Sequence, residues 1–357
     1  MGDALPQPVL IVGTGLLGTS LGLALRRHDV EVLLVDRNPE NLRTATGLGA
    51  GRAYDGPDSG PDVGLVVVAV PPDHVAEEID RALSTTDAVV TDVGSVKTAP
   101  LTALADHEGL ARYAGGHPMA GSERSGPLAA TPTIFDGRPW AVTPHATSSD
   151  AATAAVEELA RLAGASIVRL SPGEHDAAVA RTSHLPHLLS VLVAGRLVDA
   201  PPEHLALSGQ GVRDVTRVAG GDPGLWQQIV TGNADAVAGL LAQVREQLDV
   251  LIDAVDRGDR GQLGAILELG VAGTRAIPGK HGGPTRPMAS VFVSVPDHPG
   301  ELARLFADAG ASDVNIEDVR IDHDPARETG LVEIVVDETR ADHLHDSLGS
   351  RGWETHR

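Results

Sequence analysis

The sequence predicts a doubly wound, parallel α/β domain, followed by an all-helical domain and a small α+β module. Three observations support this prediction. Short apolar runs alternate with helix-like segments up to about residue 170, strand signals then stop, and a second alternation follows the Gly- and Pro-rich stretch at 278–287. Alternating strands and helices favour a parallel sheet. We therefore expect a first domain over 1–170, a helical domain over 171–277, a linker over 278–287 and a final module over 288–357.

The expected strands of the first domain cover residues 9–12, 30–36, 65–70 and 88–93, with helical segments such as 16–26 between them. Two last strands, at 140–143 and 166–170, flank an expected helix over 149–163. Apolar runs of this length, separated by amphipathic segments, are typical of a buried parallel sheet.

The helical domain contains one long apolar stripe. Its members follow the i, i+3, i+4 spacing of a single helix face: Val237, Leu240, Leu241, Val244, Leu248, Leu251, Ile252 and Val255. Such a face packs in a core or between subunits, and the pattern alone does not separate the two. A homodimer is the sharper expectation.

A dinucleotide-binding loop is expected after the first strand. It has G-x-G-x-x-G spacing and comprises Gly13, Thr14, Gly15, Leu16, Leu17 and Gly18. Gly13 permits a tight turn, Gly15 lets the backbone approach a pyrophosphate, and Gly18 allows close packing of helix and strand. The following helix N-terminus would hold the phosphates of the cofactor. This arrangement predicts a Rossmann domain.

The cofactor is expected to be NAD. Asp36 ends the second strand, where a carboxylate accepts hydrogen bonds from the ribose hydroxyls and repels the additional phosphate of NADP. Arg37 beside it could attract that phosphate, so NADP remains the alternative. Val70 and Pro71 end the third strand and are expected to wall the nicotinamide side.

Two residues are candidates for catalysis. Ser95 lies in the stretch DVGSVK (92–97), after a strand and at the sheet edge where ligands bind, although it could also cap a helix. His117 follows two glycines and precedes Pro118, which predicts an imidazole on a loop.

These motifs together resemble the prephenate/arogenate dehydrogenase family of tyrosine biosynthesis. The resemblance rests on the glycine loop, GSVK (94–97) and HPMAGSERSG (117–126), and it extends from Val9 to about Trp353. It implies oxidation and decarboxylation of prephenate to 4-hydroxyphenylpyruvate, with hydride transfer to NAD. It also implies that His117 accepts the proton of the ring hydroxyl and that Ser95 helps to orient the reacting groups.

The same resemblance implies a set of substrate-binding residues. SHLPH (183–187) places His184 and His187 around the polar end of the substrate, and GVRDVTR (211–217) makes Arg217 the ligand of a substrate carboxylate. The remaining members are Asp214, Glu123 and Trp226. The chain departs from many relatives at Gly220 and Gly221, where a serine often stands.

The C-terminal module resembles an ACT domain through its D-x-P-G-x-L turn and a later N-I-E. We expect a βαββα unit with strands at 289–295, 314–321 and 330–336 and helices at 301–309 and 341–351. The resemblance implies an amino-acid effector, tyrosine by inference, held by Asp297, His298, Gly300, Asn315 and Ile316. A module that only supports dimerisation is the alternative.

Composition excludes several classes of function. Asp and Glu number 49 against 28 Lys and Arg, and a formal net charge of -21 argues against nucleic-acid or anionic-membrane partners. Cysteine is absent, which removes thiolate chemistry. No signal peptide or long apolar segment is evident, so a cytoplasmic enzyme is expected. No metal is expected either, because H-E-x-x-H does not occur and hydride transfer needs none.

Other functions remain open. Arogenate and amino-deoxy prephenate are alternative substrates, and a tyrosine-binding protein that has lost catalysis is the alternative from another class. β-Hydroxyacid dehydrogenases share the glycine fingerprint, but they ordinarily use a lysine in the helical domain. This chain has no Lys between His117 and Pro278.

Overall fold

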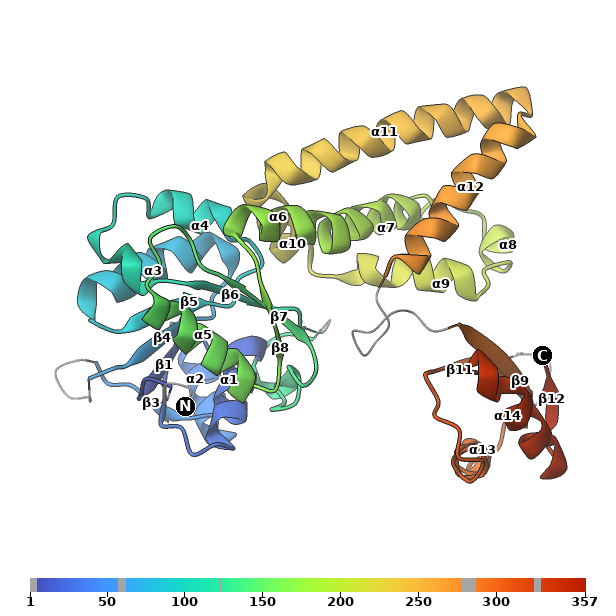
Figure 1. The fold of residues 1–357 in the computed structure, drawn as a ribbon, viewed down its shortest axis with the longest axis horizontal. Coiled ribbons are helices and arrows are strands. Elements are labelled where there is room, and N and C mark those ends of the chain that lie inside the picture. The colour runs from blue at the N-terminus through green and yellow to red at the C-terminus, as the bar shows by residue number, and fades with distance from the viewer. Residues whose placement is uncertain (1–4, 57–61, 122–123, 278–286, 324–328) are drawn as a thin grey trace. The chain divides into compact units, whose positions relative to one another are not determined.

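The computed structural model describes residues 5–56, 62–121, 124–277, 287–323 and 329–357. The chain divides into two compact units, Met1–Glu246 and Gln247–Arg357 (Figure 1). The expected linker at 278–287 lies almost wholly outside the described residues.

The first unit is built on a five-stranded parallel sheet with the order β3-β2-β1-β4-β5. Its strands are β1 (Val9–Val12), β2 (Val32–Val35), β3 (Arg52–Ala53), β4 (Leu65–Val68) and β5 (Val89–Asp92). The order of the strands reverses between β1 and β4, which creates the crevice where open α/β sheets bind ligands. This arrangement confirms the predicted doubly wound sheet.

The next three strands form a separate small sheet, not the end of the parallel one. Its strands are β6 (Gly115–Pro118), β7 (Pro139–Thr143) and β8 (Ser166–Arg169), in that order, with β6 antiparallel to β7. The expectation that His117 lies on a loop is wrong, because His117 pairs with Ala141 in this sheet. The preceding glycines allow neighbouring atoms to approach the backbone of β6 closely. A Cβ at Gly115, for example, would lie 2.5 Å from Thr143 Oγ1.

Five α-helices accompany these strands (Figure 1). They are α1 (Leu16–Arg26), α2 (Pro39–Gly47), α3 (Pro72–Thr85), α4 (Thr98–Ala103) and α5 (Asp150–Leu162). Asn38 and Ser149 cap α2 and α5 by accepting backbone N–H groups in the first turn. The apolar core between helices and sheets is aliphatic, and Phe135 and Trp140 are its large aromatic members.

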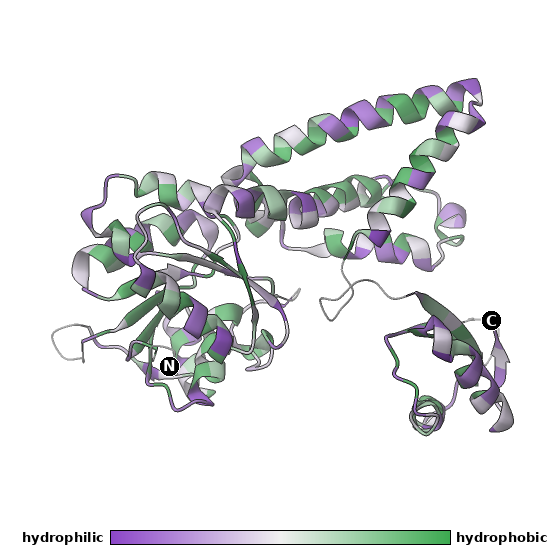
Figure 2. Cartoon of the chain, viewed as in Figure 1, coloured by the Kyte–Doolittle hydropathy of each residue, from purple (hydrophilic) through white to green (hydrophobic). Residues whose placement is uncertain are grey.

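A run of helices completes the first unit. They are α6 (Pro172–Val179), the π-helical turn η3 (Ala180–His184), α7 (Leu185–Gly195), α8 (Pro202–Leu205), α9 (Gln210–Thr216), the 3-10 turn η4 (Arg217–Gly220) and α10 (Pro223–Gly232). Ser171 and Glu174 form a reciprocal capping box at the start of α6. Helix α11 (Ala234–Arg257) continues into the second unit. Figure 2 shows apolar residues along α7 and α11.

The second unit contains α12 (Arg260–Arg275) and an antiparallel sheet with the order β10-β11-β9-β12. The elements of this module are β9 (Met288–Pro296), α13 (Glu301–Gly310), β10 (Asp318–His323), β11 (Thr329–Asp337), α14 (Glu338–Ser350) and β12 (Glu354–His356). The order is therefore βαββαβ, with one terminal strand more than expected. The strand expected over 314–321 starts later, at Asp318.

Candidate active site

The glycine loop has the geometry of a phosphate cradle. Gly13 adopts φ 99°, and a Cβ there would lie 2.4 Å from the carbonyl oxygen of Ala69. A Cβ at Gly18 would lie 2.0 Å from the carbonyl oxygen of Gly13, whereas a Cβ at Gly15 would meet nothing within 4 Å. Gly15 also precedes α1 without a capping side chain, so the first N–H groups of α1 are free to bind an anion. The loop therefore fits a pyrophosphate.

Asp36 connects this loop to the end of β2. Its Oδ2 accepts the backbone N–H of Thr14 at 2.6 Å and the Thr14 hydroxyl at 2.8 Å, and its Oδ1 accepts the N–H of Asn38 at 2.7 Å. The carboxylate therefore holds the loop in shape, in addition to the ribose contact that the sequence predicts.

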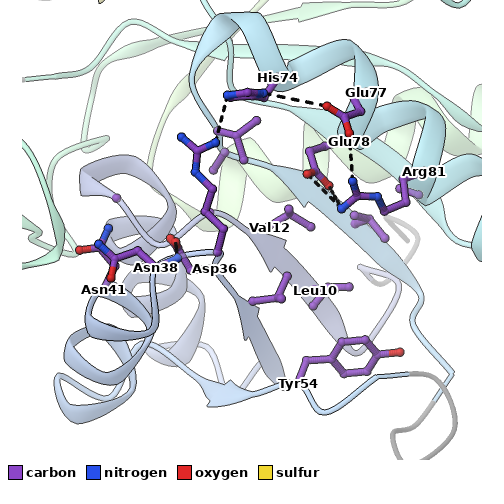
Figure 3. A pocket seen from close by; sticks show the side chains of 18 of the residues that line it. Leu10, Val12, Asp36, Asn38, Asn41, Tyr54, His74, Glu77, Glu78 and Arg81 are labelled. Atoms are coloured by element: carbon purple, nitrogen blue, oxygen red, sulfur yellow. Dashed lines mark hydrogen bonds and ion pairs between the residues drawn. The ribbon is translucent and has the colours of Figure 1, made fainter.

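A cavity of about 990 Å³ opens beside the loop (Figure 3). Its lining includes six of the expected cofactor-binding residues: Gly13, Gly15, Asp36, Arg37, Val70 and Pro71. The other four, Thr14, Leu16, Leu17 and Gly18, belong to the loop and α1 and do not line the cavity.

His74, which the motifs did not mark, lies on the wall of this cavity. Arg37 Nη1 lies 3.0 Å from His74 Nε2, and His74 Nδ1 lies 4.0 Å from a Glu77 carboxylate oxygen (Figure 3). His74 stands in the first turn of α3, two residues after Pro72. Its place in the helical turn after the two prolines was the only signal in the sequence.

His117 belongs to a chain of three polar side chains. Its Nδ1 lies 2.8 Å from His175 Nε2, and His175 Nδ1 lies 2.8 Å from Asp176 Oδ1. The two imidazoles meet edge to face, with centroids 5.1 Å apart. His175 and Asp176 are buried in α6, and neither was a candidate from the sequence. No described residue hydrogen-bonds to His117 Nε2, so that nitrogen is available to a substrate.

A second buried cluster supports the strand that carries His117. The Lys97 ammonium pairs with Asp92 and donates to the carbonyl oxygen of Gly116 at 2.8 Å, while the Tyr113 hydroxyl donates to Asp92 at 2.8 Å. Burial lowers the pKa of Lys97 in spite of the Asp92 charge. This ion pair fixes Gly116, and therefore His117, against the end of β5.

The environment keeps His117 neutral. Burial lowers its pKa well below the ordinary value, and the neighbouring His175, Lys97 and His184 lower it further, against the opposing charge of Asp176. A neutral imidazole with one free nitrogen can act as a general base at neutral pH.

The helical part of the unit contributes His184, His187 and Trp226. The Asn233 side-chain amide donates to the backbone carbonyl of Asp176 at 2.8 Å and lies 3.3 Å from His184 Nδ1, which places His184 beside the histidine chain. The His187 ring stacks on Trp226 with centroids 3.5 Å apart. Burial lowers the pKa of His184 to about 4. His184 therefore stays neutral too.

Ser95 lines a smaller cavity of about 230 Å³. Gly94 and Val96 from its own loop, Val75 from α3, and Gln228 from α10 also line it. The interpretation of Ser95 as a helix cap is wrong, because α4 starts at Thr98 and Lys97 is its N-cap residue.

The remaining predicted substrate-binding residues are less closely connected to the cluster of His117, His175, Asp176 and His184. Arg217 and Asp214 are both exposed, and the Asp214 carboxylate accepts from the Gln210 amide at 2.9 Å. Among the described residues, neither forms a hydrogen bond or ion pair with the histidines. Glu123 lies outside the described residues.

The predicted effector residues lie in the C-terminal module. Asp297, His298 and Gly300 form the turn before α13, where Gly300 adopts φ 98°. The Asn315 amide donates to Glu317 at 2.7 Å, and Ile316 packs against the core of the module.

The described residues lack two other features. No helix there is both long and apolar enough to span a membrane. Likewise, in the described part of the chain no three His, Asp or Glu side chains are grouped so that they could hold a metal ion.

A parallel sheet with a glycine loop at its switch point, in a chain that also holds a neutral histidine on β6, defines a dinucleotide-dependent oxidoreductase. Residues 21–169 match the prephenate dehydrogenase nucleotide-binding domain, and residues 171–269 match the prephenate dehydrogenase dimerization domain. The chain belongs to the prephenate dehydrogenase family, a family of NAD-dependent oxidoreductases.

Individual relatives are similar over most of their length. The probable prephenate dehydrogenase NovF of Streptomyces niveus is 38% identical, over 97% of this chain and 99% of its own. The prephenate dehydrogenase of Bacillus subtilis is 27% identical over 89% of both chains. The crystal structure of A. aeolicus prephenate dehydrogenase with hydroxyphenyl propionate and NAD⁺ is 28% identical, with a TM-score of 0.69 over 76% of this chain and 99% of that one. Synechocystis arogenate dehydrogenase is 26% identical, with a TM-score of 0.63 over 74% and 98%.

Proposed function

We propose that this enzyme oxidises prephenate to 4-hydroxyphenylpyruvate and CO₂, with NAD as the oxidant and His117 as the general base. The observation that carries the proposal is the free Nε2 of a neutral His117, held by β6 at the end of the nucleotide-binding sheet. Family membership supports the choice of reaction.

The glycine loop and Asp36 would hold NAD, which would supply the acceptor for a hydride from the ring carbon that carries the hydroxyl. His117 Nε2 receives the hydroxyl proton as the C–O bond gains carbonyl character, and Ser95 helps to orient the hydroxyl group. The ring then loses its carboxylate as CO₂ and becomes an aromatic phenolate, which drives the reaction, and the phenolate takes the proton back from His117. The protein has to hold one proton and position two carboxylates, and no further acid is required of it.

Recognition of the substrate falls to the helical part of the first unit. His184, His187 and Trp226 surround the polar end of the substrate, and the Arg217 guanidinium pairs with a carboxylate in a bidentate manner. Asp214 orients neighbouring groups, and Glu123 stands near the entrance.

Arogenate is the second candidate substrate, because one structural relative is an arogenate dehydrogenase. The proposal is tested by NADH formation with prephenate and arogenate, each offered with NAD and with NADP. The highest kcat/KM should belong to prephenate with NAD. A preference for arogenate would keep the mechanism and change the specificity, whereas a preference for NADP would assign Arg37 and His74 to its additional phosphate.

We propose that the enzyme is a homodimer. Leu192, Val198 and Leu207 of the helical region are 63%, 79% and 86% exposed. Large apolar side chains that are this exposed often face a partner. The match of 171–269 to a dimerization domain supports a second copy as that partner.

Tyrosine is the proposed feedback effector, bound by the C-terminal module in the manner of an ACT domain. The βαββαβ order and the exposed turn before α13 support this assignment. Replacing Asn315 with Ala should raise the tyrosine concentration needed for half-inhibition at least about tenfold, a loss of about 1.4 kcal/mol, and leave kcat unchanged. Inhibition assays on the full chain test this. An unaltered response would place tyrosine at the active site instead.

A further inference from the structure

We infer that His175 and Asp176 are positioning residues that select the proton-accepting tautomer of His117. This inference rests on the proposed role of His117 as the base. It starts from the unbroken chain of contacts between His117 Nδ1, His175 and Asp176, each 2.8 Å long.

Asp176, at one end of this chain of contacts, determines which atom donates each hydrogen bond. Burial raises the pKa of Asp176, but hydrogen bonds from His175 and Thr98, and from the Lys97 backbone, outweigh it and leave the pKa below its ordinary value. Asp176 is therefore a carboxylate that can only accept. It accepts the N–H of Lys97 at 2.9 Å and of Thr98 at 2.8 Å, so His175 Nδ1 must carry the proton that it shares with Asp176.

The donor and acceptor of the contact between His175 and His117 follow in the same way. With Nδ1–H directed at Asp176, neutral His175 presents only the lone pair of Nε2, and His117 Nδ1 must donate to it. The remaining nitrogen of His117, Nε2, then carries a lone pair and faces the substrate. His175 is only 1% exposed, and its two ring nitrogens lie 2.8 Å from His117 Nδ1 and from Asp176 Oδ1, so both of its hydrogen-bonding positions are used within the chain.

The chain also compensates charge during turnover. When the substrate hydroxyl gives its proton to Nε2, His117 becomes an imidazolium whose Nδ1–H is already bonded to His175 and, through it, to the Asp176 carboxylate. The other charged or titratable groups that act on His117 are Lys97, from the loop before α4, and His184, from η3. Lys97, His184 and His175 all oppose the new charge, so Asp176 is the group whose charge stabilises it.

The first test measures kcat and KM for His175→Phe and His175→Gln in the full-length enzyme. Phe keeps the ring volume but cannot accept a hydrogen bond. We expect kcat to fall at least about tenfold with KM unchanged. Gln places an amide oxygen near the former Nε2 and should restore part of kcat. His145→Phe, at a histidine whose ring nitrogens bond Tyr113 and Thr147 groups, is the matched control.

The second test is independent of turnover. Ring-nitrogen chemical shifts of isotopically labelled histidine in the free protein, assigned with the His117 and His175 variants, report the tautomer directly. We expect the Nδ1–H form of His117 in the unmodified protein and in His175→Gln. An Nε2–H form of His117 in the unmodified protein, or an unchanged kcat in His175→Phe, would each overturn the inference. If His117→Asn is also fully active, the proposed base itself is wrong.

Discussion

Replacing His117 with Asn should reduce kcat by a factor of about 10² to 10⁴, or about 3 to 5 kcal/mol of barrier, and leave the affinity for NAD unchanged. The imidazole is the only described side chain that combines a low pKa, a buried hydrogen-bond partner and a free nitrogen beside β5. Asn keeps a donor towards His175 but has no basic nitrogen. Initial rates with prephenate and NAD titration by fluorescence measure the two quantities.

The control for this substitution is His145→Asn, at a histidine that stacks on Tyr113 away from the reacting centre. It should retain kcat within about threefold, because general-base effects are much larger than that. A His117→Asn enzyme that is as active as this control would remove His117 from the mechanism.

Replacing two glycines of the cofactor loop with alanine should affect two different quantities, the affinity for NAD at Gly15 and the stability of the fold at Gly18. Gly15→Ala should weaken NAD binding at least about tenfold, or about 1.4 kcal/mol, because the added methyl occupies the space through which the pyrophosphate approaches the backbone. It should leave thermal stability unchanged, because the methyl meets no protein atom within 4 Å. Gly18→Ala should instead lower the free energy of unfolding by about 1–3 kcal/mol, because its methyl would lie 2.0 Å from the Gly13 carbonyl oxygen.

Calorimetric titration with NAD and thermal unfolding without it separate the two effects. The pair of variants is matched, since both add one methyl to the same loop. Normal NAD affinity in Gly15→Ala would mean that the phosphates do not approach this glycine, and the cofactor assignment of the loop would be wrong.

The parts of the fold that are local in sequence were predictable. The glycine loop, Asp36 and the parallel strands follow from spacing and apolar runs within short stretches. β6 was not predictable in this way, because the glycines before His117 are typical of a flexible turn. They are needed for another reason: a Cβ at Gly116 would lie 2.8 Å from the Asp92 carbonyl oxygen. That approach depends on the tertiary structure.

The same limit explains the residues that sequence reasoning missed. His175 reaches His117 across 58 positions, and its neighbours in α6 carry no motif that marks it as functional. His74 meets Arg37 across 37 positions. By contrast, Ser95, His184, His187 and Trp226 were suggested by family motifs, and the structure places each of them beside a cavity or the histidine cluster.

The measurement that tests the central claim most directly is a product analysis with prephenate and NAD. The account predicts that 4-hydroxyphenylpyruvate, CO₂ and NADH appear in equal amounts and that His117→Asn slows all three together. Loss of CO₂ without formation of NADH, or no turnover at all, would contradict it.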